Sequence, residues 1–397
     1  MTFVRPYGRQ QIDDDDVAAV AAVLRSDFLT TGPVVPAFEA ALAEVVGARF
    51  AVVCSSGTAA LHLAMAALGI GSGDVVIVPT ITFVATANAA RMVGAEVVFA
   101  DVRPEDGLMG ADELEAAVGR AKARGRAKAV VPVHLGGQCW APDVLQEVAR
   151  KHQLVVIEDA CHSLGTTYAG QARVGACRHS DAAVFSFHPV KTVAMGEGGA
   201  ITTNDAAIDA HMRRFRSHGI ERDAGAFLHK DMALDGRGAT NPWYYEMPSF
   251  GFNYRASDIN CALGLSQLRK LPRFRRARQE LVRQYDRALA PLAPAVRSVA
   301  PIPNCDATRH LYTVLFDFAA IGKDRAQVMN ELRDRGVGTQ VHYIPVHQQP
   351  YYRERYGATH LAGAEAYYRR CLSLPLYVGM TATDVGAVAD AVRAVVA

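Results

Sequence analysis

Short runs of β-branched residues alternate with helical patterns through the first half of the chain, and this alternation limits the folds that the chain can adopt. Seven runs are apolar at nearly every position, which is typical of strands covered on both faces of a sheet. They are residues 51–54, 74–78, 96–102, 129–133, 154–157, 182–187 and 200–203. Strands that alternate with helices favour a mostly parallel sheet with right-handed crossovers. We therefore predict a doubly wound α/β domain built on a seven-stranded sheet.

The pattern changes after about residue 205. Residues 221–250 form a long irregular segment with several glycines and prolines, and such a loop in a compact domain is usually functional or disordered. A smaller α/β domain then follows, with a basic helix over 257–289, strands over 311–316 and 339–343, a helix over 325–335, and helices around Ala364 and Thr383. Thr381 and Asp384 have the spacing of a capping box. We predict a large domain over residues 1–259, with an N-terminal arm, and a small domain over 260–397.

Composition excludes several classes of protein. The 397 residues include 42 Lys+Arg and 40 Asp+Glu, and the net charge of +2 gives no electrostatic reason to expect nucleic acid or an anionic membrane as partner. No apolar run approaches the ~20 residues needed to span a bilayer, and the N-terminus lacks the apolar core of a signal peptide. The seven cysteines include no C-x-x-C pair, which favours reduced thiols and no metal site. We expect a cytoplasmic protein.

Three segments carry residues suited to chemistry. The first is residues 55–58, Ser-Ser-Gly-Thr, between a predicted strand and a helix. Unpaired N–H groups and the helix dipole favour an anion such as phosphate there, and Gly57 lets a ligand approach the backbone. The alternative is a plain helix N-cap.

The second segment places Asp159 at the carboxyl end of a buried strand, where open α/β sheets bind ligands. A carboxylate there needs a cationic partner, although an N-cap is the alternative. The third places Lys191 after an apolar strand and before a glycine-rich turn. A partly buried lysine has a lowered pKa and can form a Schiff base, whereas an exposed loop lysine is the alternative.

Together the three segments describe a site for pyridoxal 5′-phosphate. A helix end would hold the phosphate, a carboxylate the pyridinium nitrogen, and a lysine the aldehyde. Dinucleotide and P-loop sites lack support, because the chain has no G-x-G-x-x-G opening a helix and no Walker A sequence.

The sequence resembles the sugar aminotransferases of the DegT/DnrJ/EryC1/StrS family, which have the fold of type I pyridoxal-phosphate enzymes. The resemblance covers essentially the whole chain, including Leu29 to Pro33. Its motifs are, in order, SSGTAALHLA, PTITFVATANAA, IEDACHSLG, FSFHPVK, GEGGAITTND and FNYRASDINCALGLSQL.

The resemblance implies a role for each matching residue. Lys191 matches the lysine that forms the Schiff base with the cofactor and then moves a proton. Asp159 matches the carboxylate that keeps the pyridine nitrogen protonated, and Asn253 matches an asparagine that reaches the phosphate of a neighbouring subunit. The resemblance therefore implies a homodimer with shared active sites. The other implied cofactor contacts are Gly57, Thr58, Phe83, His162 and Ser186.

Within the family, three features resemble the pseudaminic acid branch. They are His188, the stretch 241–246 and the stretch 341–347. Enzymes of this branch aminate C4 of UDP-2-acetamido-2,6-dideoxy-β-L-arabino-hexos-4-ulose with L-glutamate as donor. The branch that makes UDP-4-amino-4-deoxy-L-arabinose shares the FSFH-x-x-K form and is the alternative. The implied substrate contacts are Tyr7, Thr30, Gly57, His188, His342, Tyr343, Ile344 and Pro345, and an ordinary strand edge is the alternative for His342 and Tyr343.

The expected activity is therefore a two-stage amino transfer from L-glutamate to a UDP-4-keto sugar. A related dehydratase branch has histidine in place of the lysine, and Lys191 argues against it. A non-catalytic regulator that binds the cofactor would need an added DNA-binding segment, and the sequence contains no helix-turn-helix extension.

Overall fold

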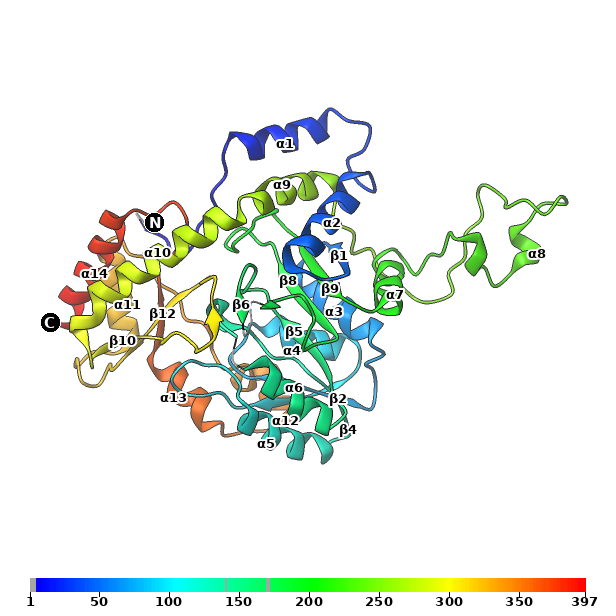
Figure 1. Cartoon of the computed structure of the whole chain (residues 1–397). Coiled ribbons are helices and arrows are strands. Elements are labelled where there is room, and N and C mark those ends of the chain that lie inside the picture. Colours follow the sequence, from blue (N-terminus) through cyan, green and yellow to red (C-terminus); the bar gives the residue numbers. More distant parts are fainter. Residues whose placement is uncertain (1–4, 140, 169–171) are drawn as a thin grey trace.

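A seven-stranded sheet lies at the centre of the larger part of the molecule (Figure 1). The computed structural model describes residues 5–139, 141–168 and 172–397. Strand β9 is antiparallel to both of its neighbours, and the remaining pairs from β8 to β3 are parallel. All seven predicted strands are present, so the prediction of a mostly parallel α/β sheet is confirmed. Their spatial order is β1 (Phe50–Cys54), β9 (Gly199–Thr203), β8 (Ala182–Ser186), β5 (Val155–Asp159), β4 (Arg126–Val130), β2 (Asp74–Pro79) and β3 (Glu96–Ala100).

Helices cover both faces of this sheet. One face carries α3 (Gly57–Ala67), α4 (Val84–Met92) and α7 (Ala206–Arg216). The other carries α2 (Val34–Val46), α5 (Ala111–Lys122) and α6 (Pro142–Lys151).

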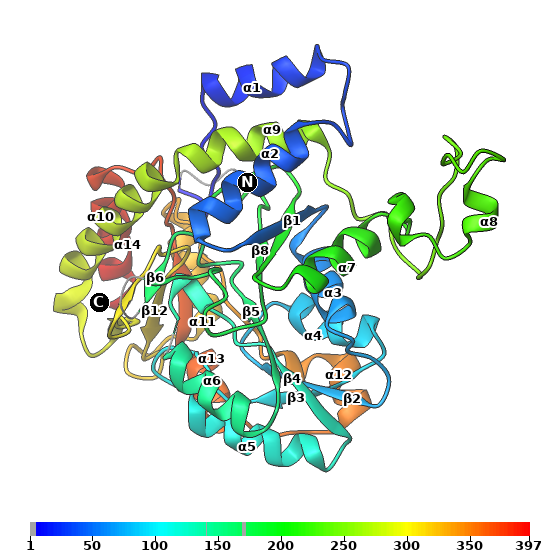
Figure 2. The same ribbon diagram turned by 45° about the vertical axis from the view of Figure 1, so that its right-hand side comes forward.

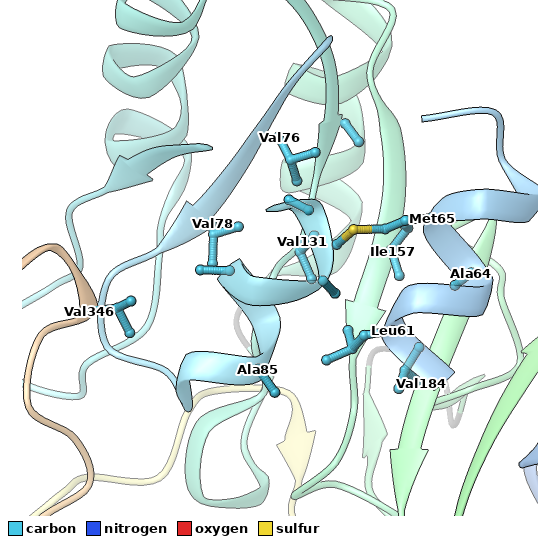
Figure 3. Close-up of a cluster of buried hydrophobic side chains, with 14 of the residues drawn as sticks. Leu61, Ala64, Met65, Val76, Val78, Ala85, Val131, Ile157, Val184 and Val346 are labelled. Carbon is cyan, nitrogen blue, oxygen red and sulfur yellow. The ribbon is translucent and has the colours of Figure 1, made fainter. Parts of the chain in front are cut away.

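Successive residues of the strands are buried on opposite sides. Val76 and Val78 pack with α3 and α4, as Figure 3 shows, whereas Val75 and Ile77 pack with α5. Burial of each such side chain stabilises the fold by about 1.5–3 kcal/mol. Both faces are therefore apolar, which explains the uninterrupted valine and isoleucine runs in the sequence.

A smaller antiparallel sheet lies in the C-terminal part, with the predicted strand at 311–316 in its centre. Its order is β10 (Val296–Ser298), β12 (Tyr312–Phe316) and β13 (Cys371–Leu374). The predicted capping box is confirmed, because Thr381 and Asp384 bond each other's backbone N–H groups. The helices that share the apolar core of this part are α10 (Leu271–Leu289), α11 (Arg325–Asp334) and α14 (Ala382–Val396).

Two predicted elements in this part are wrong. The single helix over 257–289 is two helices, α9 (Asp258–Arg269) and α10, which meet at Lys270 because Pro272 cannot continue the hydrogen bonding of α9. Residues 339–343 are not a strand, since only Gln340 forms a bridge, to Ser373 of β13.

After Gln340 the chain leaves the small sheet and crosses to the large one. The N–H of Val346 donates to the carbonyl oxygen of Thr80 at 2.9 Å, and Val346 joins the buried cluster of the large sheet (Figure 3). The boundary between residues 259 and 260 stays a prediction. The elements of this region are η4 (Val346–Gln348), α12 (Pro350–Tyr356) and α13 (Ala362–Arg370).

The remaining elements lie around these two sheets. Helix α1 (Asp14–Leu24) packs across α9, where the buried Asp16 accepts hydrogen bonds from Ser266 and Gln267 (Figure 1). A second small sheet has the order β11 (Cys305–Asp306), β6 (Thr167–Tyr168) and β7 (Ala172–Arg173). Two short 3₁₀ helices are η1 (Leu135–Gly137) and η3 (Ala290–Leu292).

Residues 221–250 form an arm that extends from the end of α7 away from the body in both views (Figures 1 and 2). The arm contains two isolated antiparallel bridges, Glu221 with Glu246 and Leu234 with Thr240, and two short helical turns, η2 (Ala224–Ala226) and α8 (Lys230–Ala233). None of the helices in the described ranges has the length and apolar character that crossing a bilayer requires.

Candidate active site

A cavity of about 950 Å³ opens where β1, β2, β5 and β8 end. These strands run in the same direction, so their carboxyl ends meet at one edge of the sheet, where α/β proteins bind ligands. All of the predicted site residues line the cavity except Thr30, Asn253 and Pro345. The predicted residues that line it are Tyr7, Gly57, Thr58, Phe83, Asp159, His162, Ser186, His188, Lys191, His342, Tyr343 and Ile344.

The amino end of α3 forms one wall. The hydroxyl of Ser56 caps the helix by accepting a hydrogen bond from the Ala59 N–H at 3.1 Å. The first turn of a helix has unpaired N–H groups and a partial positive charge, so this wall is suited to an anion. A Cβ atom at Gly57 would lie 2.9 Å from Cβ of Ser186, so glycine keeps this space open. The space fits a phosphate group beside Gly57, Thr58 and Ser186.

Asp159 lies at the end of β5 and is almost fully buried. Its carboxylate accepts one hydrogen bond from Oγ1 of Thr86 at 2.7 Å and another from the Cys161 N–H at 3.2 Å. Because Thr86 has a single hydroxyl proton, Oγ1 of Thr82, 2.8 Å away, must donate to Thr86. Each carboxylate oxygen can accept a further hydrogen bond, so Asp159 is placed to hold a cationic nitrogen in the cavity.

Lys191 lies in the connection between β8 and β9. This loop is closed by the Phe187 N–H, which donates to the Gly198 oxygen at 2.9 Å, and by the Lys191 N–H, which donates to the His188 oxygen at 2.8 Å. Burial lowers the pKa of the Lys191 amine, while negative charge at Cys161 and Asp159 acts in the opposite direction. A lowered pKa leaves more of the amine unprotonated, which is the form that attacks a carbonyl carbon.

The ring of His162 is oriented by its two hydrogen bonds. Its Nδ1 accepts from the Gly136 N–H at 3.3 Å, so the proton of the neutral ring is on Nε2. Nε2 lies 3.2 Å from Oη of Tyr343 and donates to it, which leaves the Tyr343 proton able to point into the cavity. Burial, with the charge of Lys191, holds the pKa of His162 well below its usual value. His162 is therefore neutral near pH 7.

The predicted substrate contacts come from both ends of the chain. The ring of Tyr7 lies 5.6 Å from that of His342, and the Tyr7 carbonyl accepts from the Leu376 N–H at 3.1 Å. His342 is buried beside Ser373, with Nδ1 2.9 Å from Oγ, and burial lowers its pKa to about 3. Tyr7 of the N-terminal segment and His342 of the segment after α11 thus lie on one wall of the cavity.

Three predicted residues lie elsewhere. Thr30 is exposed and pairs with Ser257 in an isolated bridge, and Asn253 is exposed opposite Ser217. Pro345 is buried but does not line the cavity. A role for these three in the same site stays a prediction.

Two residues of the cavity, Thr86 and His310, carry no strong sequence signal of their own. Thr86 lies on the first turn of α4, three residues after Phe83. This spacing is the only sequence feature that would place Thr86 near the predicted contact Phe83. His310 precedes β12, and its ring centroid lies 4.5 Å from that of His162. Its buried Nδ1 has no hydrogen-bond partner among the described residues.

Comparison with known proteins agrees with this chemistry. Residues 10–393 match the model of the DegT/DnrJ/EryC1/StrS aminotransferase family. The chain is 38% identical over 396 residues to the spore coat polysaccharide biosynthesis protein SpsC of Bacillus subtilis (strain 168), which covers 98% of this chain and 97% of that protein.

Solved structures match over the same length. Helicobacter pylori PseC, an aminotransferase involved in the biosynthesis of pseudoaminic acid, is 31% identical with a TM-score of 0.88, covering 100% of this chain and 99% of that one. The PLP-form of the putative sugar aminotransferase Spr1654 from Streptococcus pneumoniae is 26% identical with a TM-score of 0.86, covering 98% of both chains. The predicted type I fold is confirmed.

Proposed function

The chain belongs to the DegT/DnrJ/EryC1/StrS family of pyridoxal-phosphate-dependent aminotransferases, and on this premise we propose that it transfers an amino group from L-glutamate to C4 of a UDP-4-keto-6-deoxy-N-acetylhexosamine. The proposed acceptor is UDP-2-acetamido-2,6-dideoxy-β-L-arabino-hexos-4-ulose, in a pathway of the pseudaminic acid type that supplies cell-surface polysaccharide. The likeness to PseC supports this choice of sugar. We assign the reaction to the cytoplasm, in keeping with seven free cysteines.

The observation that carries the proposal is the meeting of three groups in one cavity. Lys191, Asp159 and the amino end of α3 would hold the aldehyde, the ring nitrogen and the phosphate of one cofactor molecule. When bound, pyridoxal phosphate supplies an electron-accepting ring for breaking a C–H bond. Nζ of Lys191 takes and returns the proton, and Asp159 holds positive charge at the ring nitrogen. Phe83, which is 57% exposed in the cavity, offers an aromatic face.

The wall formed by Tyr7, His342 and Tyr343 supports a sugar nucleotide as the second ligand. These side chains combine apolar ring surface with a few polar groups, as specific small-molecule sites do. The cavity volume of about 950 Å³ is at the upper end of the usual range for ligand sites, which leaves room for more than a cofactor.

Replacing the lysine tests the mechanism. Lys191→Ala is expected to lose amine transfer by at least ~10²–10⁴-fold, the usual contribution of general acid–base catalysis. Borohydride reduction of the loaded wild type should attach a pyridoxyl group to the peptide that contains Lys191, as read by mass spectrometry. The exposed Lys151→Ala in α6 is the control and should keep the wild-type rate. Attachment at another lysine would contradict the assignment.

A panel of UDP-4-keto sugars with L-glutamate tests the substrate. We expect amination at C4 of the N-acetylhexosamine, identified by NMR of the product. Turnover of the 4-keto pentose in place of the hexosamine would support the UDP-4-amino-4-deoxy-L-arabinose alternative. No amination of either sugar by an enzyme loaded with cofactor would contradict the proposal.

The proposal includes a homodimer with shared active sites. The arm exposes several large apolar side chains, which in a soluble protein usually mark a contact surface. Asn253 follows the arm and lies outside the cavity of its own chain, where it could serve a neighbouring one. The apolar residues of the arm that are more than half exposed are Leu228, Met232, Trp243, Tyr245, Met247 and Phe250.

Mixing two inactive variants tests the shared site. In a dimer of Lys191→Ala and Asn253→Ala chains, one of the two sites contains both intact residues. Random reassortment in a twofold-symmetric dimer should therefore restore roughly a quarter of the wild-type activity. Absence of activity, with heterodimers shown by differential tagging, would contradict sharing through Asn253.

A further inference from the structure

The structure places two cysteines from distant parts of the sequence in contact. The sulfurs of Cys139 and Cys305 are 3.5 Å apart, and the Cys139 N–H donates to the Cys305 sulfur at 3.4 Å. Cys139 follows η1 of the large domain, whereas Cys305 begins β11. All seven cysteines lie in the described ranges, and no other pair among them has a thiol–thiol contact of this kind.

Hydrogen bonds hold the two segments together. Gln138 binds the segment before Cys305 twice, since its Oε1 accepts from the Ile302 N–H at 2.9 Å and its Nε2 donates to the Ala300 oxygen at 3.2 Å. Further along, the His310 N–H donates to the Gly136 oxygen at 2.9 Å. The contact between the thiols is therefore built into the fold, through the Gln138 side chain and the backbone bond from His310.

The two thiols differ in exposure and in ionisation. Cys305 is partly exposed, whereas Cys139 is buried. The hydrogen bond from Cys139 lowers the pKa of the Cys305 thiol to about 7, with positive charge at His134 and Arg309 acting in the same direction. Cys305 is thus the thiol that an oxidant can reach in its reactive thiolate form.

From this geometry we propose that Cys139 and Cys305 are a reversible modification site, a dithiol that a hydroperoxide converts to a disulfide. The Cys305 thiolate attacks the peroxide, whose O–O bond breaks, giving a sulfenic acid and an alcohol or water. The Cys139 sulfur then attacks the sulfenic sulfur, its proton leaves with the departing hydroxyl as water, and the S–S bond forms. The two thiols lose two electrons in total, which the peroxide gains. In a reducing compartment such a bond acts as a transient redox signal and not as a structural staple.

The site is connected to the cavity. Gly136, three residues before Cys139, donates to His162, and His310, five residues after Cys305, lies against the ring of His162. When the disulfide forms, the distance between the two sulfurs shortens from 3.5 Å to about 2.05 Å, which draws these segments together. Oxidation should therefore alter the wall of the cavity that holds His162.

The experiment treats the reduced holoenzyme with a small molar excess of hydrogen peroxide, then unfolds it in urea and adds iodoacetamide. We expect two of the seven thiols to escape alkylation, a peptide linking Cys139 to Cys305, and full recovery of thiols with dithiothreitol. Cys305→Ser, at the partly exposed position, should abolish the linked peptide. Cys371→Ser in β13 is the matched control and should retain it.

Three results would overturn the proposed dithiol site. They are no loss of thiols on oxidation, a disulfide-linked peptide that joins cysteines other than Cys139 and Cys305, or Cys305 as sulfinic acid with Cys139 still a free thiol. The connection to the cavity is read separately from the cofactor absorption spectrum. A spectral change that appears on oxidation and reverses with dithiothreitol in wild type, but is missing in Cys305→Ser, supports it. An unchanged spectrum in a fully cross-linked enzyme overturns that connection.

Discussion

One hydroxyl, that of Thr86, donates to the Asp159 carboxylate, which we propose holds the ring nitrogen of the cofactor. Hydrogen bonds to charged groups contribute about 1.5–3 kcal/mol, and tenfold in affinity corresponds to ~1.4 kcal/mol. We expect Thr86→Val to raise the Kd for pyridoxal phosphate by about 10–100-fold, because Asp159 then loses a donor and is held less firmly. Titration of the apoenzyme followed by absorbance measures this change.

Thr82→Val is the matched control for that variant. Thr82 is equally buried but donates to Thr86 and not to Asp159, so its loss should weaken binding by less than tenfold. Equal losses in the two variants would show that the effect comes from packing and not from the bond to Asp159.

At the scale of residues, some positions of the site can be predicted from the sequence, whereas others depend on contacts that only the folded chain creates. Asp159 and Lys191 are recognisable because a carboxylate and an amine follow apolar strands. Thr86 and His310 are not, since their partners Asp159 and His162 lie 73 and more than 100 residues away. Such contacts exist only after the strands have assembled.

At the scale of elements, the amino end of α3 depends on the absence of a side chain at Gly57. A Cβ atom there would lie 2.9 Å from Cβ and 3.3 Å from Oγ of Ser186, within the space that we propose the phosphate occupies. We expect Gly57→Ala to fold but to bind the cofactor at least about tenfold more weakly, the loss of one hydrogen bond to a charged group. Equilibrium titration and thermal unfolding measure the two quantities.

Gly119→Ala is the control for this substitution. Gly119 lies inside α5, and a Cβ atom there would meet nothing within 4 Å. In a helix interior, glycine makes the fold less stable than alanine does by about 0.5–1 kcal/mol. This variant should therefore be more stable to unfolding and keep its cofactor affinity. Unchanged affinity in Gly57→Ala would mean that the phosphate does not lie beside α3.

Elements buried on both faces were the most predictable. The seven strands of the large sheet stand out as uninterrupted apolar runs, because helices cover both sides. Strand β13 has the sequence Cys-Leu-Ser-Leu, in which polar and apolar residues share a short run, and it is not recognisable from the pattern. Residues 339–343 look like a strand, but only Gln340 pairs with β13, and Tyr343 bonds His162 in the cavity.

At the scale of the whole molecule, anion binding does not need a basic surface. The formal net charge is only +2, although a phosphate cofactor and, as proposed, a nucleotide diphosphate bind here. Helix ends and a few placed side chains can hold these anions locally. The sequence could not predict how the N-terminal segment and the chain after α11 come to the same cavity, because no local pattern encodes these long-range crossings.

The whole fold should also lose stability in acid because of the histidines around the cavity. Burial lowers the pKa values of His162, His310 and His342, with the charge of Lys191 acting in the same direction, and the pKa of His342 falls to about 3. Below pH 6.5 the unfolded chain binds protons at these positions that the folded chain does not. The free energy of unfolding therefore falls as pH falls from about 6.5 toward the lowered values, by up to ~1.4 kcal/mol per pH unit for each histidine.

Urea unfolding at pH 7.5, 6.0 and 5.0 measures this dependence. His310→Gln removes one buried ring. We expect it to reduce the slope of the free energy of unfolding against pH, between pH 6 and 5, by about 1.4 kcal/mol per pH unit, whatever the stability of the variant at neutral pH. His211→Gln, which replaces an exposed histidine of α7, is the control for the substitution itself. A slope that is the same in all three proteins would mean that His310 takes up a proton in the folded state, and that the wall of the cavity is open to water.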